Sequence, residues 1–425
     1  MHSRLILKAQ SKNNVKKNDN DDDNLSSDDE EEISKIYIGK LLNNRYTIIK
    51  YLGKGTFSRL WIIYDIIENS FKALKIQNED DIEEGENEIQ ILKNKNHPNV
   101  INLYDYFIDN ENNKLCLVLE LLGGDLFTLL DEYNTIPFQL LKKIYYQTLN
   151  GINFLHQHNI IHTDLKLENI LIDKIHPRNM ELINFIKEKI DFNFDTLLEN
   201  NIPENYNEFT PDKRKKTKRK IKLKIIKFLN EKIIELVKMY NHIPHEDYNY
   251  SIEDLKDINV KIIDLGNGEF TNDISNEEIS YKFYRSPENI LGFKYNVSTD
   301  IWTLGCLFYE MITKKYLIEI NQYKNNIDRD SKLLFEMQKY FGRIPTNLCI
   351  NSEYYEDLYD SKGRLLKYKN IEENSKSLFT ELSEYYQNDI KYLIELLNEM
   401  FNYDYKNRIS AKKCINHIFF SELKN

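Results

Sequence analysis

The sequence predicts an α+β fold arranged as two lobes, with an insertion in the second lobe. The chain has 425 residues, a length that fits one large two-lobed unit or two or three domains. Residues 43–76 are rich in β-branched and aromatic side chains around a glycine turn, which predicts a β-rich first lobe. With 29 Tyr and 21 Phe, the chain has the aromatic content of a packed core rather than of a disordered protein.

An acidic segment precedes this lobe. Residues 1–36 carry nine acids and six bases, and they have too few apolar side chains to offset the entropy of ordering. We therefore expect a disordered acidic tail over 1–36. Ser26 and Ser27 in the block SSDDEEE each have an acid three residues later. The tail is thus either a solubilising segment or an acceptor site for an acid-directed kinase.

The first lobe contains a glycine loop between two predicted strands. The runs TIIKYL and RLWIIYDI flank Gly53 and Gly55, and FKALKI predicts the next strand, which carries Lys75. NEIQILK then predicts a helix with Glu88. A glycine loop lets the backbone approach a phosphate chain closely, although Gly-x-Gly alone also fits a simple hairpin, and Ser58 stands where a third glycine would.

Residues 174–256 form the predicted insertion. They hold 17 bases and 14 acids, and nine of the bases lie between Lys213 and Lys224 with no acid among them. Apolar residues recur at helical spacing just after this run. The run is therefore either the solvated face of a helix or a nuclear-import, trafficking or polyanion contact, and direct nucleic-acid binding is not expected.

Composition excludes several classes of protein. No stretch of 18 apolar residues occurs, so a membrane-spanning helix is not expected. The N-terminal apolar run is too short for a signal peptide. The four cysteines form no CxxC pair, which argues against a disulfide framework and a zinc site. We expect a soluble intracellular protein.

Two loops carry side chains that suit phosphoryl transfer. Transfer from MgATP needs a carboxylate that accepts a hydroxyl proton, and an asparagine and a second aspartate for Mg²⁺. The segments IIHTDLKLENILI and VKIIDLGN supply these groups: Asp164, Lys166, Asn169 and Asp264. Each has an ordinary structural explanation alone, such as a turn aspartate. Together with Lys75 on a strand and Glu88 to orient it, their order favours catalysis.

In this combination the chain resembles a eukaryotic protein kinase from about 43 to 420. YRSPE at 284–288 is similar to the end of an activation segment, and Asp300 to the aspartate of the F helix. Arg408 is similar to the arginine that pairs with the glutamate of that segment. The resemblance implies a bilobal kinase fold, with a small β-rich N-lobe holding one main helix and a larger, mostly helical C-lobe. The implied divisions are a tail at 1–36, the N-lobe at 37–122, the C-lobe at 123–173 and 257–425, and a spacer at 174–256.

Within the kinases, the chain resembles the SR-protein kinases of the CMGC group. His162-Thr163-Asp164 replaces His-Arg-Asp, Asp264-Leu265-Gly266 replaces Asp-Phe-Gly, and the loop GKGTFSRLW is similar. The two aspartates stand 100 residues apart, and this family splits its domain with a spacer at the same place. LAMMER and DYRK-like kinases share HTDLK and YRSPE, so these remain alternatives.

The resemblance assigns a role to each site residue, with ATP and Mg²⁺ as cofactors. Asp164 would orient the substrate hydroxyl and accept its proton, and Lys166 would neutralise the γ-phosphate. Asn169 and Asp264 would bind Mg²⁺. The residues implied to contact or position the nucleotide are Leu52, Gly53, Lys54, Gly55, Thr56, Phe57, Ser58, Arg59, Leu60, Lys75, Glu88, Glu120 and Leu122.

Several positions depart from the general kinase pattern, among them Leu167, which replaces the usual proline. Tyr281 stands where Ser or Thr is expected, and Lys282 where Arg is expected. The usual Thr bonds the catalytic Asp and Lys, a contact that a bulkier Tyr cannot make from the same backbone position, so the substrate geometry is open. Thr163 replaces the arginine that captures an activation-loop phosphate, which predicts constitutive activity.

The implied substrates are serines in Arg-Ser-rich splicing factors. Outside the tail and the insertion the net charge is −10, which favours basic partners. Asp328 and Asp330 are either docking acids for such a substrate or ordinary solvated acids at a helix start. We expect a monomer in the cytoplasm and the nucleus. The alternatives are a DYRK- or LAMMER-like kinase of other specificity, or a pseudokinase scaffold, which Tyr281 favours and the intact catalytic set opposes.

Overall fold

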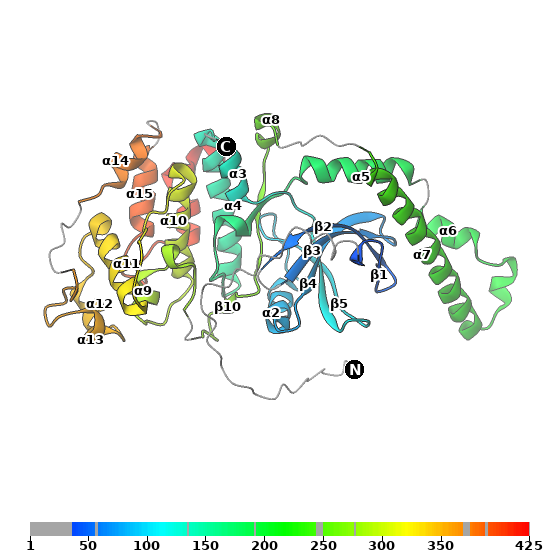
Figure 1. Ribbon diagram of the computed structural model, residues 1–425, viewed down its shortest axis with the longest axis horizontal. Coiled ribbons are helices and arrows are strands. Elements are labelled where there is room, and N and C mark those ends of the chain that lie inside the picture. The colour runs from blue at the N-terminus through cyan, green and yellow to red at the C-terminus, as the bar shows by residue number, and fades with distance from the viewer. Residues whose placement is uncertain are drawn as a thin grey trace.

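The structure, a computed structural model, contains two lobes and a separate group of helices. Figure 1 shows a sheet-based N-lobe beside a helical C-lobe, with α5, α6 and α7 on the outer side of the N-lobe. The predicted two-lobed α+β architecture is confirmed. The predicted tail up to residue 35, including Ser26 and Ser27, lies outside the described residues, as do Thr56 and Phe57. The structure describes residues 36–55, 58–133, 136–190, 193–243, 250–275, 278–368, 375–386 and 390–424.

The N-lobe is a six-stranded antiparallel sheet with one helix, α2 (Ile82–Leu92), packed against it. β-Branched and aromatic side chains fill both faces: Trp61 and Ile63 are buried on one face and Ile62 on the other. The second face is continuous with the main core of the protein. The strand order is β1-β2-β3-β4-β6-β5, with β1 at Leu41–Leu42, β2 at Tyr46–Lys54, β3 at Ser58–Asp65, β4 at Ser70–Gln77, β5 at Leu103–Asp109 and β6 at Lys114–Leu119.

The C-lobe is built around α10 (Ser298–Thr313), in which every residue is buried. Two short antiparallel ladders, β8 with β9 and β10 with β7, lie where the lobes meet and hold the functional loops. The remaining elements are α3 (Leu126–Glu132), α4 (Phe138–Gln157), β7 (Ile160–Ile161), η1 (Leu167–Asn169), β8 (Ile170–Ile172), β9 (Val260–Ile262), β10 (Glu269–Phe270), η3 (Lys282–Tyr284), α9 (Pro287–Ile290), α11 (Asn326–Phe341), α12 (Thr346–Ile350), α13 (Tyr355–Leu358), α14 (Leu378–Ser383), α15 (Ile390–Met400), α16 (Ala411–Ile415) and η4 (Ile418–Lys424).

A buried ion pair ties α9 to the C-terminal part of the C-lobe. Arg408 donates to both carboxylate oxygens of Glu288, at 2.7 and 2.8 Å, and both side chains are fully buried. Arg408 also donates to the carbonyl oxygens of Ser298 and Asn402. This is the pairing that the kinase resemblance implies for these two residues.

The predicted spacer forms helices that leave the C-lobe after β8 and return before β9. Its two ends are joined, because the Asp173 amide donates to the Asn259 carbonyl at 2.8 Å and Lys174 pairs with Asp254. No helix in the described part of the chain combines the length and apolar character that crossing a bilayer requires. The spacer elements are α5 (Pro177–Lys189), α6 (Phe194–Asn200), η2 (Glu204–Glu208), α7 (Pro211–Asn241) and α8 (Ile252–Leu255).

Candidate active site

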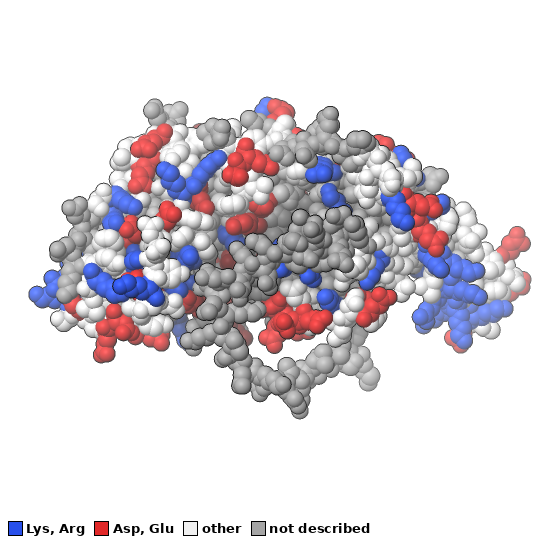
Figure 2. All heavy atoms as spheres, viewed as in Figure 1, with Lys and Arg blue, Asp and Glu red and all other residues white. Residues whose placement is uncertain are grey.

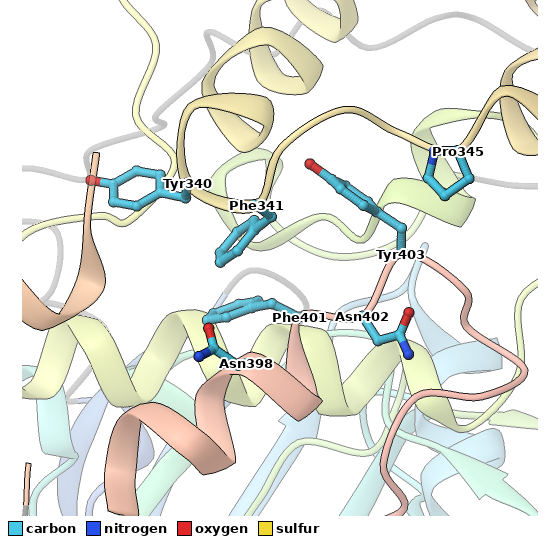
Figure 3. A pocket seen from close by; sticks show the side chains of 7 residues that line it. All are labelled: Tyr340, Phe341, Pro345, Asn398, Phe401, Asn402 and Tyr403. Carbon is cyan, nitrogen blue, oxygen red and sulfur yellow. The ribbon is translucent and has the colours of Figure 1, made fainter. Parts of the chain in front are cut away.

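Two hollows of the molecule differ in the chemistry that lines them. On the C-lobe, a hollow of about 420 Å³ lies between α11 and α15, where the rings of Phe341 and Phe401 stack at 4.6 Å. Figure 3 shows its aromatic and amide lining, which contains no carboxylate or ammonium group. Between the lobes, a cleft of about 640 Å³ is lined by Lys75, Glu88 and Asp264, together with the glycine loop. The cleft is therefore the candidate active site.

Lys75 joins three parts of the protein at the back of the cleft. It lies on β4, and its ammonium donates to Glu88 on α2 at 2.7 Å and to Asp264, after β9, at 2.8 Å. Burial alone would lower the pKa of Lys75, but the two carboxylates outweigh it, and the pKa is raised. Lys75 is therefore a fixed cation at any physiological pH.

The segment that carries Asp264 is held against α2. Asp264 has a left-handed backbone, with φ of 59°, and the Asn87 side chain donates at 2.7 Å to each of the carbonyl oxygens of Gly266 and Gly268. Burial opposes ionisation of Asp264, but Lys75, followed by smaller contributions from other cations, keeps its pKa below the ordinary value. The Asp264 carboxylate is thus ionised and fixed in orientation.

The catalytic loop, which contains the segment IIHTDLKLENILI, places Asp164 beside two other predicted site residues. Lys166 donates to the Asp164 carboxylate at 3.1 Å, and the Asn169 amide donates to the Asp164 carbonyl at 2.8 Å and to its carboxylate at 3.3 Å. Burial would lower the pKa of Lys166, but Asp164 reverses the effect and raises it. Asp164 does not itself line the nucleotide hollow, whereas Lys166 and Asn169 do.

Asp300 fixes the backbone of this loop from α10. Its carboxylate accepts the amides of His162 and Thr163, at 3.0 and 3.2 Å, and bonds the His156 ring at 2.8 Å. Thr163 has a left-handed φ of 69°, a conformation that costs energy in a β-branched residue. The buried Asp300 offsets this strain and so sets the direction in which Asp164 emerges from the loop.

The predicted metal ligands have the donor chemistry of a hard divalent cation. The Asn169 Oδ1 and Asp264 Oδ2 atoms accept no hydrogen bond from the described residues, and both side chains line the cleft. No group of three or more His, Cys, Asp or Glu side chains in the described ranges is arranged to hold a metal alone. A cation here would therefore share its coordination with phosphate oxygens, as Mg²⁺ commonly does.

The glycine loop lines the roof of the cleft. Gly53 has a φ of 155°, which favours glycine, and a β-carbon there would meet no atom within 4 Å. Arg59 does not line the cleft although Ser58 and Leu60 do, because successive side chains of a strand point to opposite faces. That Arg59 contacts the nucleotide, as the kinase resemblance implies, therefore stays a prediction. The predicted loop residues that do line it are Leu52, Gly53, Lys54, Gly55, Ser58 and Leu60.

The segment between the lobes offers backbone groups to a planar ligand. The Glu120 carboxylate is bound by Asn102 at 2.8 Å and by Lys261 at 2.9 Å, so it is already paired. In the described part of the chain, neither the Glu120 carbonyl nor the Leu122 amide has a hydrogen-bond partner. Both residues line the cleft, where these groups suit the edge of an adenine.

The structure shows how the chain accommodates Tyr281. Its ring packs against Phe283, Tyr284 and Tyr316, and 41% of the residue is exposed. The neighbouring Ser280, with a left-handed φ of 65°, donates its hydroxyl to the Thr163 carbonyl at 2.9 Å. A hydroxyl of the activation segment therefore still contacts the catalytic loop, but one residue earlier in the chain and at the backbone.

Two cleft residues that sequence reasoning missed come from the spacer. His176 and Asn179 line the cleft at the start of α5, and Lys50 of β2 donates to Asn179 at 2.8 Å. Burial, with smaller contributions from Lys50 and Arg178, lowers the pKa of His176, so its ring is neutral at pH 7. The only feature of the sequence that could have marked these two residues is the dipeptide His176-Pro177, which is typical of a helix start.

Glu310 is a further acid that the sequence did not reveal. It lies on α10, accepts the Tyr284 hydroxyl at 2.7 Å and is buried. Burial raises its pKa to about 7, and the exposed Glu168 of the catalytic loop adds to the rise. Glu168 and Glu310 are therefore neighbouring acids beside the catalytic loop.

Asp328 and Asp330 do not form the exposed docking surface that the sequence suggested. Asp328 pairs with Lys367 at 3.0 Å, Asp330 pairs with Arg329 at 2.8 Å, and the two side chains are only 10% and 9% exposed. They are also not solvated acids. Their partners come from α11 itself and from the segment after α13, so only the tertiary fold revealed the pairing.

Comparisons with known proteins agree with this geometry. A model of the protein kinase domain matches residues 46–211 and 216–420. The serine/threonine-protein kinase SRPK of Physarum polycephalum is 27% identical over 404 residues, covering 91% of this chain and 88% of that protein. The dual specificity protein kinase lkh1 of Schizosaccharomyces pombe is 25% identical over 397 residues, covering 89% of this chain and 47% of that protein, so the chain spans about half of lkh1.

A solved structure supports the fold. The crystal structure of the PF14_0431 kinase domain aligns with a TM-score of 0.63 and 20% identity, covering 90% of this chain and 97% of that one. The predicted resemblance to CMGC kinases of the SRPK type is confirmed by the curated relatives. Because the kinase-domain model covers most of its length, the chain belongs to the protein kinase family.

Proposed function

We propose that this chain is an active serine/threonine kinase that phosphorylates serines in basic, Arg-Ser-rich segments of splicing factors. The observation that best supports catalytic activity is the Lys75 ammonium, which is held between Glu88 and Asp264 at 2.7 and 2.8 Å. Lys166 and Asn169 line the same cleft. A scaffold without catalysis has no need of this arrangement. The intact set therefore argues against the pseudokinase alternative.

In the proposed mechanism the chain acts mainly by positioning and by offsetting charge. ATP with Mg²⁺ supplies the phosphoryl group and partly neutralises its charge. Lys75 would orient the α- and β-phosphates, and Asn169 and Asp264 would hold the cation. Asp164 orients the substrate hydroxyl and accepts its proton, while Lys166 faces the transferred group.

Two features support a basic substrate. The exposed Glu168 and the buried Glu310 interact electrostatically beside the catalytic loop, and a guanidinium placed beside Glu168 would favour ionisation of Glu310. The SRPK of Physarum polycephalum is similar over 91% of this chain. The similarity to lkh1, a dual specificity kinase, favours the second candidate, a LAMMER-like kinase of other specificity.

Constitutive activity also belongs to this proposal. Thr163 donates its hydroxyl to the Asn267 carbonyl at 2.7 Å, and Arg285 pairs with Glu278 at 3.1 Å, so the activation segment is attached without a phosphate. Phosphatase treatment should leave the rate unchanged; a loss of activity would contradict the idea. We further propose that the chain acts as a monomer in the cytoplasm and the nucleus.

The test is transfer of radiolabelled phosphate from MgATP to an Arg-Ser repeat peptide, to a matched Gln-Ser repeat and to a generic basic protein, with Asp164→Ala as the inactive control. Strong labelling of serine in the Arg-Ser peptide alone is the expected result. Labelling of the generic protein but not of the Arg-Ser peptide would favour the LAMMER-like alternative. Nucleotide binding without any transfer would favour the scaffold.

A second variant tests the acid pair. Glu168→Gln should raise the KM for the Arg-Ser peptide about tenfold while the KM for ATP stays unchanged, because a charge-assisted contact would be lost only with the substrate. An equal rise for the Gln-Ser peptide would show that Glu168 does not recognise arginine.

A further inference from the structure

The first half of α7 is a basic surface at the outer end of the spacer. Between residues 211 and 224 no side chain is buried, whereas Ile225, Leu229 and Ile233 in the second half are buried. Figure 2 shows the blue side chains gathered at the outer end of this helix. We call these nine residues the basic end of α7: Lys213, Arg214, Lys215, Lys216, Lys218, Arg219, Lys220, Lys222 and Lys224.

These cations lack acidic partners within the residues that the structure describes. Lys213 lies 3.8 Å from the centre of the Phe209 ring, Arg214 donates to the Phe209 carbonyl, and Lys222 lies 5.8 Å from the Phe194 ring. No ion pair with a carboxylate forms at any of the nine positions among the described residues. Like charges four residues apart, such as Lys216 and Lys220, destabilise a helix. An anionic occupant would relieve this repulsion.

The chain enters the folded domain beside α7. Tyr37 packs on Trp61 at 5.2 Å, and Asn230 of α7 donates to the Gly39 carbonyl at 3.4 Å. Asn230 also accepts the Thr47 hydroxyl at 2.7 Å. The residues that directly follow the acidic tail are therefore anchored on the second half of α7.

The acidic block of the tail is within reach of the basic end. At 1.5 Å of rise per residue, Lys224 and Lys213 lie roughly 9 and 26 Å along α7 from Asn230. Glu32, the last acid of the block, is seven residues before Gly39. Seven residues can span up to about 25 Å. The two segments can thus meet within one chain.

We propose that the acidic segment from Asp19 to Glu32 binds the basic end of α7 of the same chain. The segment has nine acids and no base, against nine bases and no acid between Lys213 and Lys224. A short tether gives an effective concentration in the millimolar range, which strengthens a contact made of individually weak exposed pairs. This contact is separate from the proposed catalytic function and does not depend on it.

The test uses proximity crosslinking in the full chain. The four natural cysteines are free and buried, so Ser27→Cys and Thr217→Cys place two reactive thiols, one on each segment, without altering any charge. A matched control pairs Ser27→Cys with Ser361→Cys, an exposed serine of the C-lobe. We expect a short bismaleimide, which adds to two thiols, to join 27 to 217 about tenfold faster than 27 to 361. Salt at about 1 M, where the Debye length is about 3 Å, should remove the difference.

Charge exchange makes the test specific. Lys216→Glu with Lys220→Glu should slow the crosslink to the control rate, and Asp29→Lys with Glu30→Lys in that background should restore it. Equal rates for the two cysteine pairs at low salt, or a rate that rises with protein concentration, would overturn the proposal, the latter by showing contact between copies.

Nucleic acid is the competing occupant. We expect removal of residues 1–33 to increase the affinity of a short single-stranded RNA for the chain, with a steeper dependence on salt, because the basic end becomes free. RNA that bound equally well before and after the removal would show that the acidic segment does not occupy this surface. Neither readout requires kinase activity.

Discussion

Lys75 in the cleft and the nine cations at the basic end of α7 are chemically similar groups in opposite settings. Lys75 is buried and held by two carboxylates at 2.7 and 2.8 Å. The α7 cations lie at the surface, without a carboxylate partner among the described residues. In the cleft, the single Lys75 ammonium is held in one position, which suits a reaction that needs its groups precisely placed. On α7, many charges share a diffuse field, which suits a contact set by net charge.

This difference predicts that single substitutions matter in the cleft and hardly at all on α7. Lys75→Met should lower phosphate transfer roughly a thousandfold, because the phosphates lose their fixed cation. Lys72→Met is the matched control, since Lys72 lies on the same strand, is buried and pairs with Asp65 at 2.7 Å on the other face. Lys216→Met should leave turnover unchanged. Equal losses in the Lys75 and Lys72 variants would show that folding, not chemistry, was affected.

The second contrast concerns stability. Arg408→Ala leaves the buried Glu288 carboxylate without its cation, which should cost about 3–5 kcal/mol of unfolding free energy. Arg219→Ala, in the exposed half of α7, should leave the denaturation midpoint where it was. Chemical denaturation followed by fluorescence measures both. Similar midpoints for the two variants would contradict the distinction between held and exposed cations.

The third contrast concerns pH. The pKa of Glu310 is raised from 4.5 to about 7, so between these values the folded state binds more protons than the unfolded state. Stability should therefore fall as pH rises through this window, by up to roughly 3 kcal/mol. Glu310→Gln should flatten that part of the curve, whereas Glu235→Gln on α7 should not. A Glu310→Gln curve that still falls as in the wild type would refute the assignment.

The smallest effect is expected at a neutral hydrogen bond. Ser280→Ala should lower kcat roughly five- to tenfold, because the activation segment loses its bond to the Thr163 carbonyl. Ser280→Thr should restore part of the rate. Thr217→Ala on α7 should change neither kcat nor KM. If Ser280→Ala raised only the KM for ATP, the hydroxyl would not act through the catalytic loop.

Much of the fold could be predicted because local patterns and tertiary structure agree. The β-branched runs in TIIKYL and RLWIIYDI form β2 and β3, and the apolar spacing after Lys224 becomes the buried stripe of α7. The long separation of Asp164 and Asp264 marked the insertion, because the helices of the spacer lie between their loops. In each case the signal lay within one short stretch of sequence or in one distance along it.

The site was less predictable where partners come from distant segments. Glu310 is one acid within a hydrophobic helix, and only the fold brings it to Tyr284 and Glu168. The same holds for Asp328, whose partner Lys367 is 39 residues away. The role of Ser280 could not be predicted, because the hydroxyl contact with the catalytic loop was expected from position 281 and comes instead from the residue before it. Sequence reasoning identified the residue types needed, but not which hydroxyl or acid the fold would present.

The joined ends of the spacer have a consequence for the evolution of this protein. Asp173 and Asn259 meet through a backbone hydrogen bond, so the C-lobe is closed across the point where the intervening helices leave and return. The entropy of closing such a loop grows only slowly with its length. A lineage can therefore change the length of the outer part of this segment at little cost, provided that Asn179 and Asn230 keep their contacts with β2. New localisation signals and binding sites can be acquired there without changes to the catalytic residues.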